Sequence, residues 1–219
     1  MWNFKELKVH LNSLGDDRQQ YIDYLESISR MIEIFEYHKT EAYRIISKLD
    51  TVEPKAAIEL ILSNSLQNEE LEYQVLVFQA HLQGALQCAR SMYDIFAQLL
   101  NVLLIIELKP IYQCSIHNVC QEIPDSKLKN ELMTVLNGQE YKYVNGFINT
   151  IKHRNLIKLN RTLDFEEFRA SIRVKKFSYQ KIDFEQAWGV DVLNHGLHIK
   201  NKLIGLGVLL NQECSVTNA

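Results

Sequence analysis

A short segment near residue 150 gathers side chains that can bind phosphate or move a proton. Asn145 and Asn149 are four residues apart, and Lys152, His153 and Arg154 follow directly. In a helix, the two amides share one face with Lys152 or His153. Cations and an imidazole in that arrangement can bind phosphate or act as acid and base. The alternative is an ordinary basic helix end, where these residues meet the negative pole of the helix dipole.

A second set of polar residues recurs at steps of three or four along an otherwise apolar segment. Its members are Gln79, Gln83, Gln87, Arg90, Asp94, Gln98 and Asn101. This spacing predicts one narrow polar stripe on a helix that is buried on its other sides. Two interpretations stay open. The stripe is either a solvated seam with Arg90 and Asp94 as an i,i+4 ion pair, or the lining of a cleft or subunit interface where Asp94 orients a cationic partner.

Two further clusters have the residue types of metal sites but too few ligands. Asp191, His195 and His198 fall on one face of the last predicted helix, with no second cluster to complete a coordination sphere. The Cys-x-x-His-x-x-Cys spacing of residues 114–120 offers three ligands, whereas structural zinc sites use four. We therefore expect no bound metal. The sequence also lacks the glycine-rich loops that hold nucleotide phosphates, so we expect no nucleotide cofactor.

Composition limits the classes of partner. The chain has 24 Lys+Arg against 27 Asp+Glu, a net charge of -3, and therefore lacks the bulk positive charge typical of sequence-independent nucleic-acid binding. Any RNA contact must be local. Four cysteines without a Cys-x-x-Cys pair indicate reduced thiols. With no signal peptide and no apolar run of membrane-spanning length, we expect a cytoplasmic protein without a membrane partner.

Helix breakers are scarce, since only 3 Pro and 8 Gly occur in 219 residues. The sequence predicts a mainly α fold, an antiparallel helical bundle with long helices and a small β-hairpin or meander inserted before the last helix. We expect one domain over residues 1–219. Its expected parts are N-terminal helices in 1–66, core helices in 67–155, a β-meander in 156–184 and the last helix in 185–210.

Several boundaries follow from capping and turn residues. Apolar periodicity predicts a first long helix over 16–49, capped by Asp16 or Asp17, and Pro54 opens a second helix. A Gln67-Asn68 turn should precede a long helix over 69–106, and 109–124 should be a loop. The remaining expected helices cover 125–136, capped by Asp125 or Ser126, and 139–155.

Two stretches of this sequence resemble HEPN domains, the helical bundles of the higher-eukaryote and prokaryote nucleotide-binding class. They are Ala-Arg-Ser-Met-Tyr-Asp-Ile-Phe-Ala-Gln-Leu-Leu-Asn at 89–101 and Asn-Thr-Ile-Lys-His-Arg at 149–154. The resemblance implies that Asp94 matches the acidic residue of the family's second core helix, and that residues 152–154 fall in its motif region. Catalytic members carry an Arg followed by a polar residue, and a His separated from that Arg by four to six residues in total. Here those positions hold Leu159, Asn160 and Arg161.

Three functions follow from these observations. The first is a HEPN-like, non-catalytic or regulatory module that binds RNA or a protein partner, in a prokaryotic defence or toxin-antitoxin context. Its binding residues would be Arg90, Asn145 and Lys152. The second is a metal-independent endoribonuclease, whose catalytic residues would be Asp94, Asn149, His153 and Arg154. The third is a structural protein that forms a helical dimer. In each case we expect a homodimer, because the first long helix is amphipathic.

Overall fold

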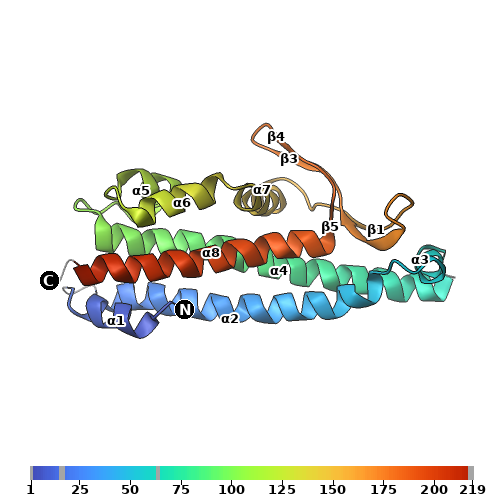
Figure 1. The fold of residues 1–219 in the computed structure, drawn as a ribbon, viewed down its shortest axis with the longest axis horizontal. Coiled ribbons are helices and arrows are strands. Elements are labelled where there is room, and N and C mark those ends of the chain that lie inside the picture. The colour runs from blue at the N-terminus through green and yellow to red at the C-terminus, as the bar shows by residue number, and fades with distance from the viewer. Residues whose placement is uncertain (1, 15–17, 63–64, 217–219) are drawn as a thin grey trace. The chain divides into compact units, whose positions relative to one another are not determined.

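The computed structural model describes residues 2–14, 18–62 and 65–216 of the chain, with helices as the main element (Figure 1). The α-helices are α1 (Phe4–Asn12), α2 (Arg18–Leu49), α3 (Pro54–Ile61), α4 (Ser65–Leu104), α5 (Ile116–Glu122), α6 (Lys127–Asn137), α7 (Gln139–His153) and α8 (Gly189–Val216), and η1 (Ile111–Gln113) is a 3-10 turn. The strands are β1 (Leu159–Asp164), β2 (Arg169–Val174), β3 (Phe177–Tyr179), β4 (Ile182–Phe184) and β5 (Ala187–Trp188). The expected class, mainly helical with a small antiparallel sheet before the last helix, is confirmed.

Two compact units share the long helices. The first comprises Met1–Glu33, Cys88–Lys142 and Leu197–Ala219, and the second comprises Ile34–Gln87 and Tyr143–Gly196. We describe each unit by itself, and the expected single HEPN-like domain stays a prediction. Among the described residues, no helix combines the length and hydropathy needed to cross a membrane.

In the first unit, the N-terminal residues close onto the C-terminal helix. The Trp2 indole is buried and donates a hydrogen bond from Nε1 to Asn211 Oδ1 at 3.0 Å. A Cβ at Gly207 would lie 2.0 Å from the Trp2 ring, so α8 can pack here only because residue 207 has no side chain. Asn3 caps α1 by accepting a hydrogen bond from the Glu6 backbone N–H.

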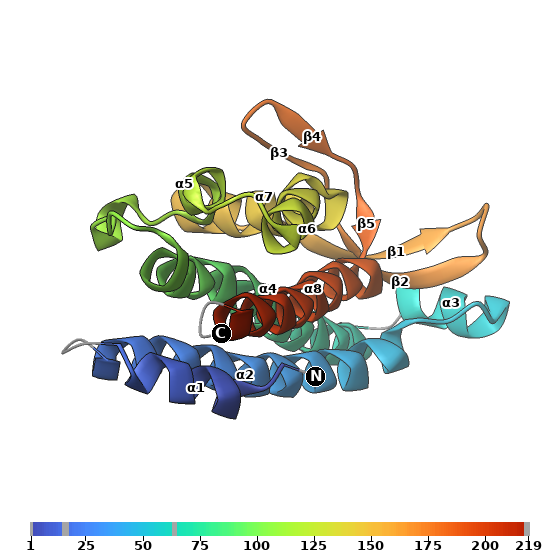
Figure 2. The same cartoon turned by 60° about the vertical axis from the view of Figure 1, so that its left-hand side comes forward.

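In the second unit, helices pack against a sheet of order β1-β2-β5, all pairs antiparallel. The α3 helix lies against β1 and β2 (Figure 1). Pro54 begins α3, as predicted, and the Glu53 side chain caps it by accepting from the Lys55 and Ala56 backbone N–H groups. The β3 and β4 strands form a separate hairpin, which Figures 1 and 2 show projecting beside the part of α7 that belongs to this unit.

The predicted turn at Gln67-Asn68 is wrong, because α4 already begins at Ser65 and runs through both residues. Asn has only a weak preference against helices, and tertiary contacts override it. Here the Arg161 guanidinium, on β1, donates hydrogen bonds to Asn68 Oδ1 and to Glu72 Oε1 on α4, and to the Leu60 carbonyl on α3. The α4 helix ends at Leu104, close to the predicted end.

The predicted loop over 109–124 is also wrong, because it contains η1 and the seven-residue α5. A helix this short gives too few turns for an apolar period to be visible. Ser115 caps α5 and Ser126 caps α6, each accepting a hydrogen bond from a backbone N–H three residues later. Ser126 was one of the two expected caps. Asp16 and Asp17, the caps expected for α2, lie outside the described residues.

The last helix begins at Gly189 and ends at Val216, so the expected bounds of 185–210 are wrong at both ends. Residues Ala187 and Trp188 form β5 instead, because they pair with β2. The α7 helix ends at His153, two residues before its expected end.

Candidate functional site

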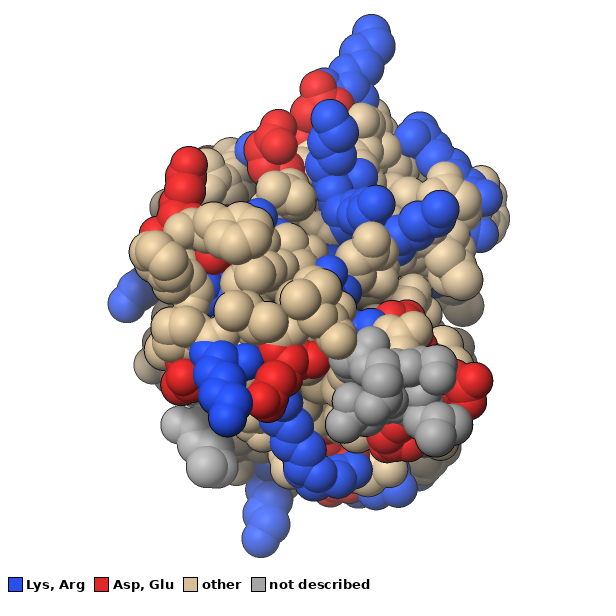
Figure 3. Space-filling view, turned by 90° about the vertical axis from the view of Figure 1, so that its right-hand side faces the viewer, with Lys and Arg blue, Asp and Glu red and all other residues tan. Residues whose placement is uncertain are grey.

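Six exposed cations occur in the second unit, at the end of α7, beside β1 and β2, and at the tip of the β3–β4 hairpin. They are Lys152, Arg154, Lys158, Lys175, Lys176 and Lys181, and we call them the basic surface. Figure 3 shows Lys and Arg side chains gathered in the upper part of one face of the molecule, with acidic side chains beside them. The five lysines form no ion pair with any other described residue, so their charges face solvent.

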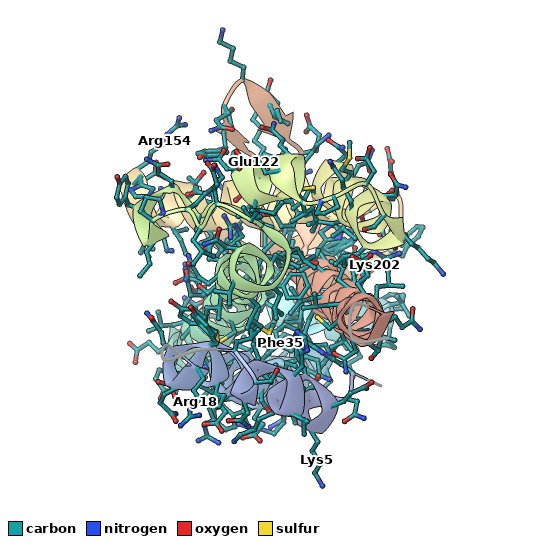
Figure 4. All side chains as sticks on the ribbon, turned by 90° about the vertical axis from the view of Figure 1, so that its left-hand side faces the viewer. Lys5, Arg18, Phe35, Glu122, Arg154 and Lys202 are labelled. Carbon is teal, nitrogen blue, oxygen red and sulfur yellow. The ribbon has the colours of Figure 1, made fainter. Side chains whose placement is uncertain are left out.

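Hydrogen bonds link the segments that carry these cations, although the segments are distant in sequence. The Lys175 backbone N–H donates to the Lys158 carbonyl at 2.9 Å, which joins the start of β1 to the end of β2. Arg154 Nη1 donates to the Ser178 carbonyl on β3 at 3.0 Å. The Arg154 guanidinium also lies 5.7 Å from the centre of the Tyr179 ring. Figure 4 shows Arg154 at the outer surface. Arg154 therefore helps to hold the hairpin in place, and its predicted catalytic role stays a prediction.

The hairpin packs on α7 through aromatic rings and a glycine. Phe177 and Phe184 stack with ring centres 4.8 Å apart, and both contact Tyr143 on α7 edge to face. A Cβ at Gly146 would lie 2.7 Å from the Phe184 ring, so the glycine allows this close approach. These contacts fix the hairpin against the end of α7.

A two-residue turn presents Lys181 at the tip of the hairpin. Gln180 and Lys181 both have positive φ, 50° and 64°. Positive φ at both central residues is typical of the type I′ turn, which matches the twist of the strands it joins. Asp183 accepts a hydrogen bond from the Ser178 hydroxyl and, with exposed Glu185, marks the acidic edge of the surface.

The other predicted residues of α7 are partly used within the helix. Asn149 Nδ2 donates to the Asn145 carbonyl at 2.8 Å and to its Oδ1 at 3.1 Å, so the two half-buried amides bind each other. His153 is exposed, and its side chain makes no hydrogen bond or ion pair with another described residue. Its imidazole thus has no carboxylate to orient it within this part of the chain, as a general base usually does.

In the first unit, α4 and α5 bring Arg90, Asp94 and His117 together around the Tyr141 ring. Arg90 Nη1 and Asp94 Oδ1 are 2.7 Å apart, which is the i,i+4 pair that the sequence predicts. The Arg90 guanidinium lies 5.8 Å from the centre of the Tyr141 ring, and the His117 ring lies 6.0 Å from it. Sequence reasoning considered His117 only as a zinc ligand and missed Tyr141, because nothing in their spacing links them to α4.

Burial keeps the tyrosines of this cluster in their neutral, protonated form. Desolvation raises the pKa of Tyr141 to about 12, and its buried hydroxyl has no hydrogen-bond partner among the described residues. Tyr93 is also buried, and its hydroxyl donates to the Ile199 carbonyl at 2.7 Å. Both rings, 5.1 Å apart, therefore serve as neutral core groups at physiological pH.

The residues of the polar stripe on α4 have several different roles. Asn101 is buried and both donates to and accepts from the backbone of Lys109, which fixes the chain after α4. Gln79 Nε2 donates to the Ile157 carbonyl at 3.4 Å, in the second unit. Arg90 and Asp94 belong to the first unit, whereas Asn145, Asn149 and residues 152–154 belong to the second.

No group of three or more His, Cys, Asp or Glu side chains suited to a metal ion occurs among the described residues. His195, considered above as a ligand, packs its ring 5.1 Å from that of Tyr143. Searches with protein-family models, curated proteins and solved structures found no match to this chain. The HEPN resemblance therefore depends on residues 89–101 and 149–154 alone and stays a prediction.

The environment of His117 can be tested by titration. Desolvation first, and then Arg90, lower its pKa from the ordinary value of 6.5, while Asp94 opposes them. We expect its NMR titration midpoint to lie below 6.5, to rise in Arg90→Gln and to fall further in Asp94→Asn. Because the unfolded chain binds this proton more tightly, the group makes the fold less stable as pH falls below 6.5. Identical midpoints in all three proteins would show that the cluster does not form.

Proposed function

We propose that this chain is a HEPN-like, non-catalytic module that binds single-stranded RNA through its basic surface. The observation that carries the proposal is a group of six exposed cations in three stretches of chain, none of which forms an ion pair with another described residue. Phosphate contacts dominate nucleic-acid affinity, so such a cluster supports binding even though the whole chain is slightly acidic. A local surface of this kind is compatible with the net charge of -3, which disfavours RNA binding by bulk charge.

An aromatic ring favours single-stranded RNA over a purely electrostatic ligand. Tyr179 is half-buried on the hairpin, with the Arg154 guanidinium near its face. Unstacked bases bind proteins by stacking on aromatic rings and on arginine planes. If a base stacked on Tyr179, the phosphates next to that nucleotide would be within reach of Lys176 and Lys181. These two lysines flank β3 in the chain.

The surroundings of His153 and Arg154 support the non-catalytic part of the proposal. A general acid or base needs a partner that orients it, and the exposed His153 imidazole has none among the residues described. Arg154 donates to the Ser178 carbonyl and lies near the Tyr179 ring, and these contacts anchor the hairpin. The defence context, the cytoplasmic location and the homodimer remain predictions of the sequence.

The proposal can be tested with a fluorescein-labelled single-stranded RNA and a labelled RNA hairpin, with and without Mg²⁺. We expect binding by fluorescence anisotropy that weakens with salt. The slope of log K against log salt concentration should be about -4 for the single strand, since six phosphate contacts contribute roughly 0.7 each. A denaturing gel should show intact RNA.

Three other results would overturn the proposal in different ways. No binding at low salt would leave a protein partner as the remaining interpretation. Cleavage that disappears in His153→Ala would make the chain a ribonuclease. A hairpin bound more tightly than the single strand would remove the role of Tyr179.

A further inference from the structure

Two histidines from different helices meet nitrogen to nitrogen in the second unit. His38 on α2 and His81 on α4 are both half-buried, and their Nδ1 atoms are 3.0 Å apart. The exposed Tyr37 ring lies beside both imidazoles, with ring centres 5.3 and 5.8 Å away. Neither histidine takes part in the basic surface or in the Tyr141 cluster.

The position of the His38 ring depends on a glycine. A Cβ at Gly84 would lie 2.8 Å from three atoms of the His38 imidazole. Any larger residue at position 84 would push the His38 ring away from its contact with α4. The backbone of α4 thus supports the ring that faces His81.

The gap between the two nitrogens has room for one proton. One Nδ1 must donate and the other must accept, because two N–H groups pointing at each other would repel. Burial, and then the proximity of His81, lower the pKa of His38. A neutral imidazole keeps a lone pair on the ring nitrogen that carries no proton, and that lone pair can bind a metal ion.

The spacing matches that of two ligands on one metal ion. Imidazole nitrogens bind at about 2.0 Å, so neighbouring ligands are roughly 2.9 Å apart in square-planar geometry and roughly 3.4 Å apart in tetrahedral geometry. The observed 3.0 Å lies within this range and close to the square-planar value. Tetragonal geometry is typical of Cu²⁺ and Ni²⁺, both of which bind imidazole well.

We propose that His38 and His81 bind a divalent transition-metal ion, Cu²⁺ or Ni²⁺, through their Nδ1 atoms. When the ion binds, the shared Nδ1 proton moves through water to Nε2 of the ring that donated it, so both rings bind the ion as neutral imidazoles with a proton on Nε2. Water completes the coordination, since the described residues offer no third His, Cys, Asp or Glu ligand. The bound ion links α2 to α4 within this unit.

The test is calorimetric titration of the full-length protein with NiCl₂ at pH 7.5. We expect one ion per chain, and at least a tenfold loss of affinity in both His38→Gln and His81→Gln. Gly84→Ala keeps both imidazoles but displaces the His38 ring, so it should lose affinity as well. His153→Gln is the matched control, because its imidazole is exposed and lies outside the pair, and its affinity should equal that of wild type.

Circular dichroism of each variant without metal establishes that the chain is folded. Electron paramagnetic resonance of the Cu²⁺ complex should show two equivalent nitrogen ligands. Absence of binding in the wild type, or wild-type affinity in His38→Gln or His81→Gln, would overturn the site. An equal loss in His153→Gln would do the same.

Discussion

Replacing Lys152, Lys175 and Lys176 together by glutamate is expected to weaken binding of single-stranded RNA by at least about 50-fold at 150 mM salt. The figure follows from losing three phosphate contacts, each of which releases about 0.7 counterion from a single strand. The three new carboxylates add repulsion, so the loss should exceed this value. The slope of log K against log salt concentration should at the same time become less negative by roughly two. Fluorescence anisotropy over a salt series measures both quantities.

A matched variant distinguishes the effect of the basic surface from the effect of overall net charge. Lys5, Lys48 and Lys127 are exposed lysines outside the basic surface, and Lys5 extends away from the ribbon in Figure 4. Replacing them by glutamate produces the same change in net charge. We expect its affinity to stay within a few-fold of wild type. If both triple variants lose affinity equally, the binding reflects overall charge and the basic surface has no special role.

The second large effect is on stability, in Trp188→Ala. Trp188 is 6% exposed and its ring contacts two guanidinium groups, with Arg173 Cζ 4.0 Å and Arg169 Cζ 4.8 Å from its ring centre. Each arginine is also paired, Arg173 with Asp164 and Arg169 with Asp50. Removing the ring leaves a cavity and exposes both ion pairs. We expect the free energy of unfolding to fall by about 3–5 kcal/mol.

Trp188→Phe provides the control for this measurement. The phenyl ring keeps most of the buried contact and the cation–π interactions, and loses only the hydrogen bond from Trp188 Nε1 to Glu167 Oε2. The free energy of unfolding of Trp188→Phe should fall by about 1 kcal/mol, the usual contribution of one hydrogen bond. Urea unfolding followed by far-ultraviolet circular dichroism compares the proteins. Equal stability of the alanine and phenylalanine variants would contradict the packing described for β5.

The sequence was informative where local patterns control structure. Scarce glycine and proline and a helical apolar period predicted the long helices and the place of the β segment, because these signals lie within one element. The helix from 65 to 104 illustrates the limit. Its start was misplaced because Asn68 is held by Arg161, a residue 93 positions away that no local pattern reveals.

The candidate site shows the same limit. Residues 152–154 were found because they are adjacent in sequence, but Lys175, Lys176 and Lys181 join them only through strand pairing and the type I′ turn. His38 and His81 are 43 positions apart and gave no signal. The Arg90–Asp94 pair was predicted because it lies within one helix, whereas its neighbour His117 comes from a helix too short to predict.

The most direct test of the RNA-binding proposal is lysine footprinting. The protein is acetylated briefly with and without saturating single-stranded RNA, and each lysine is quantified by mass spectrometry. We expect protection of Lys152, Lys158, Lys175, Lys176 and Lys181, with unchanged modification of Lys5, Lys48 and Lys127. Protection spread evenly over all lysines, or confined to those outside the basic surface, would contradict it.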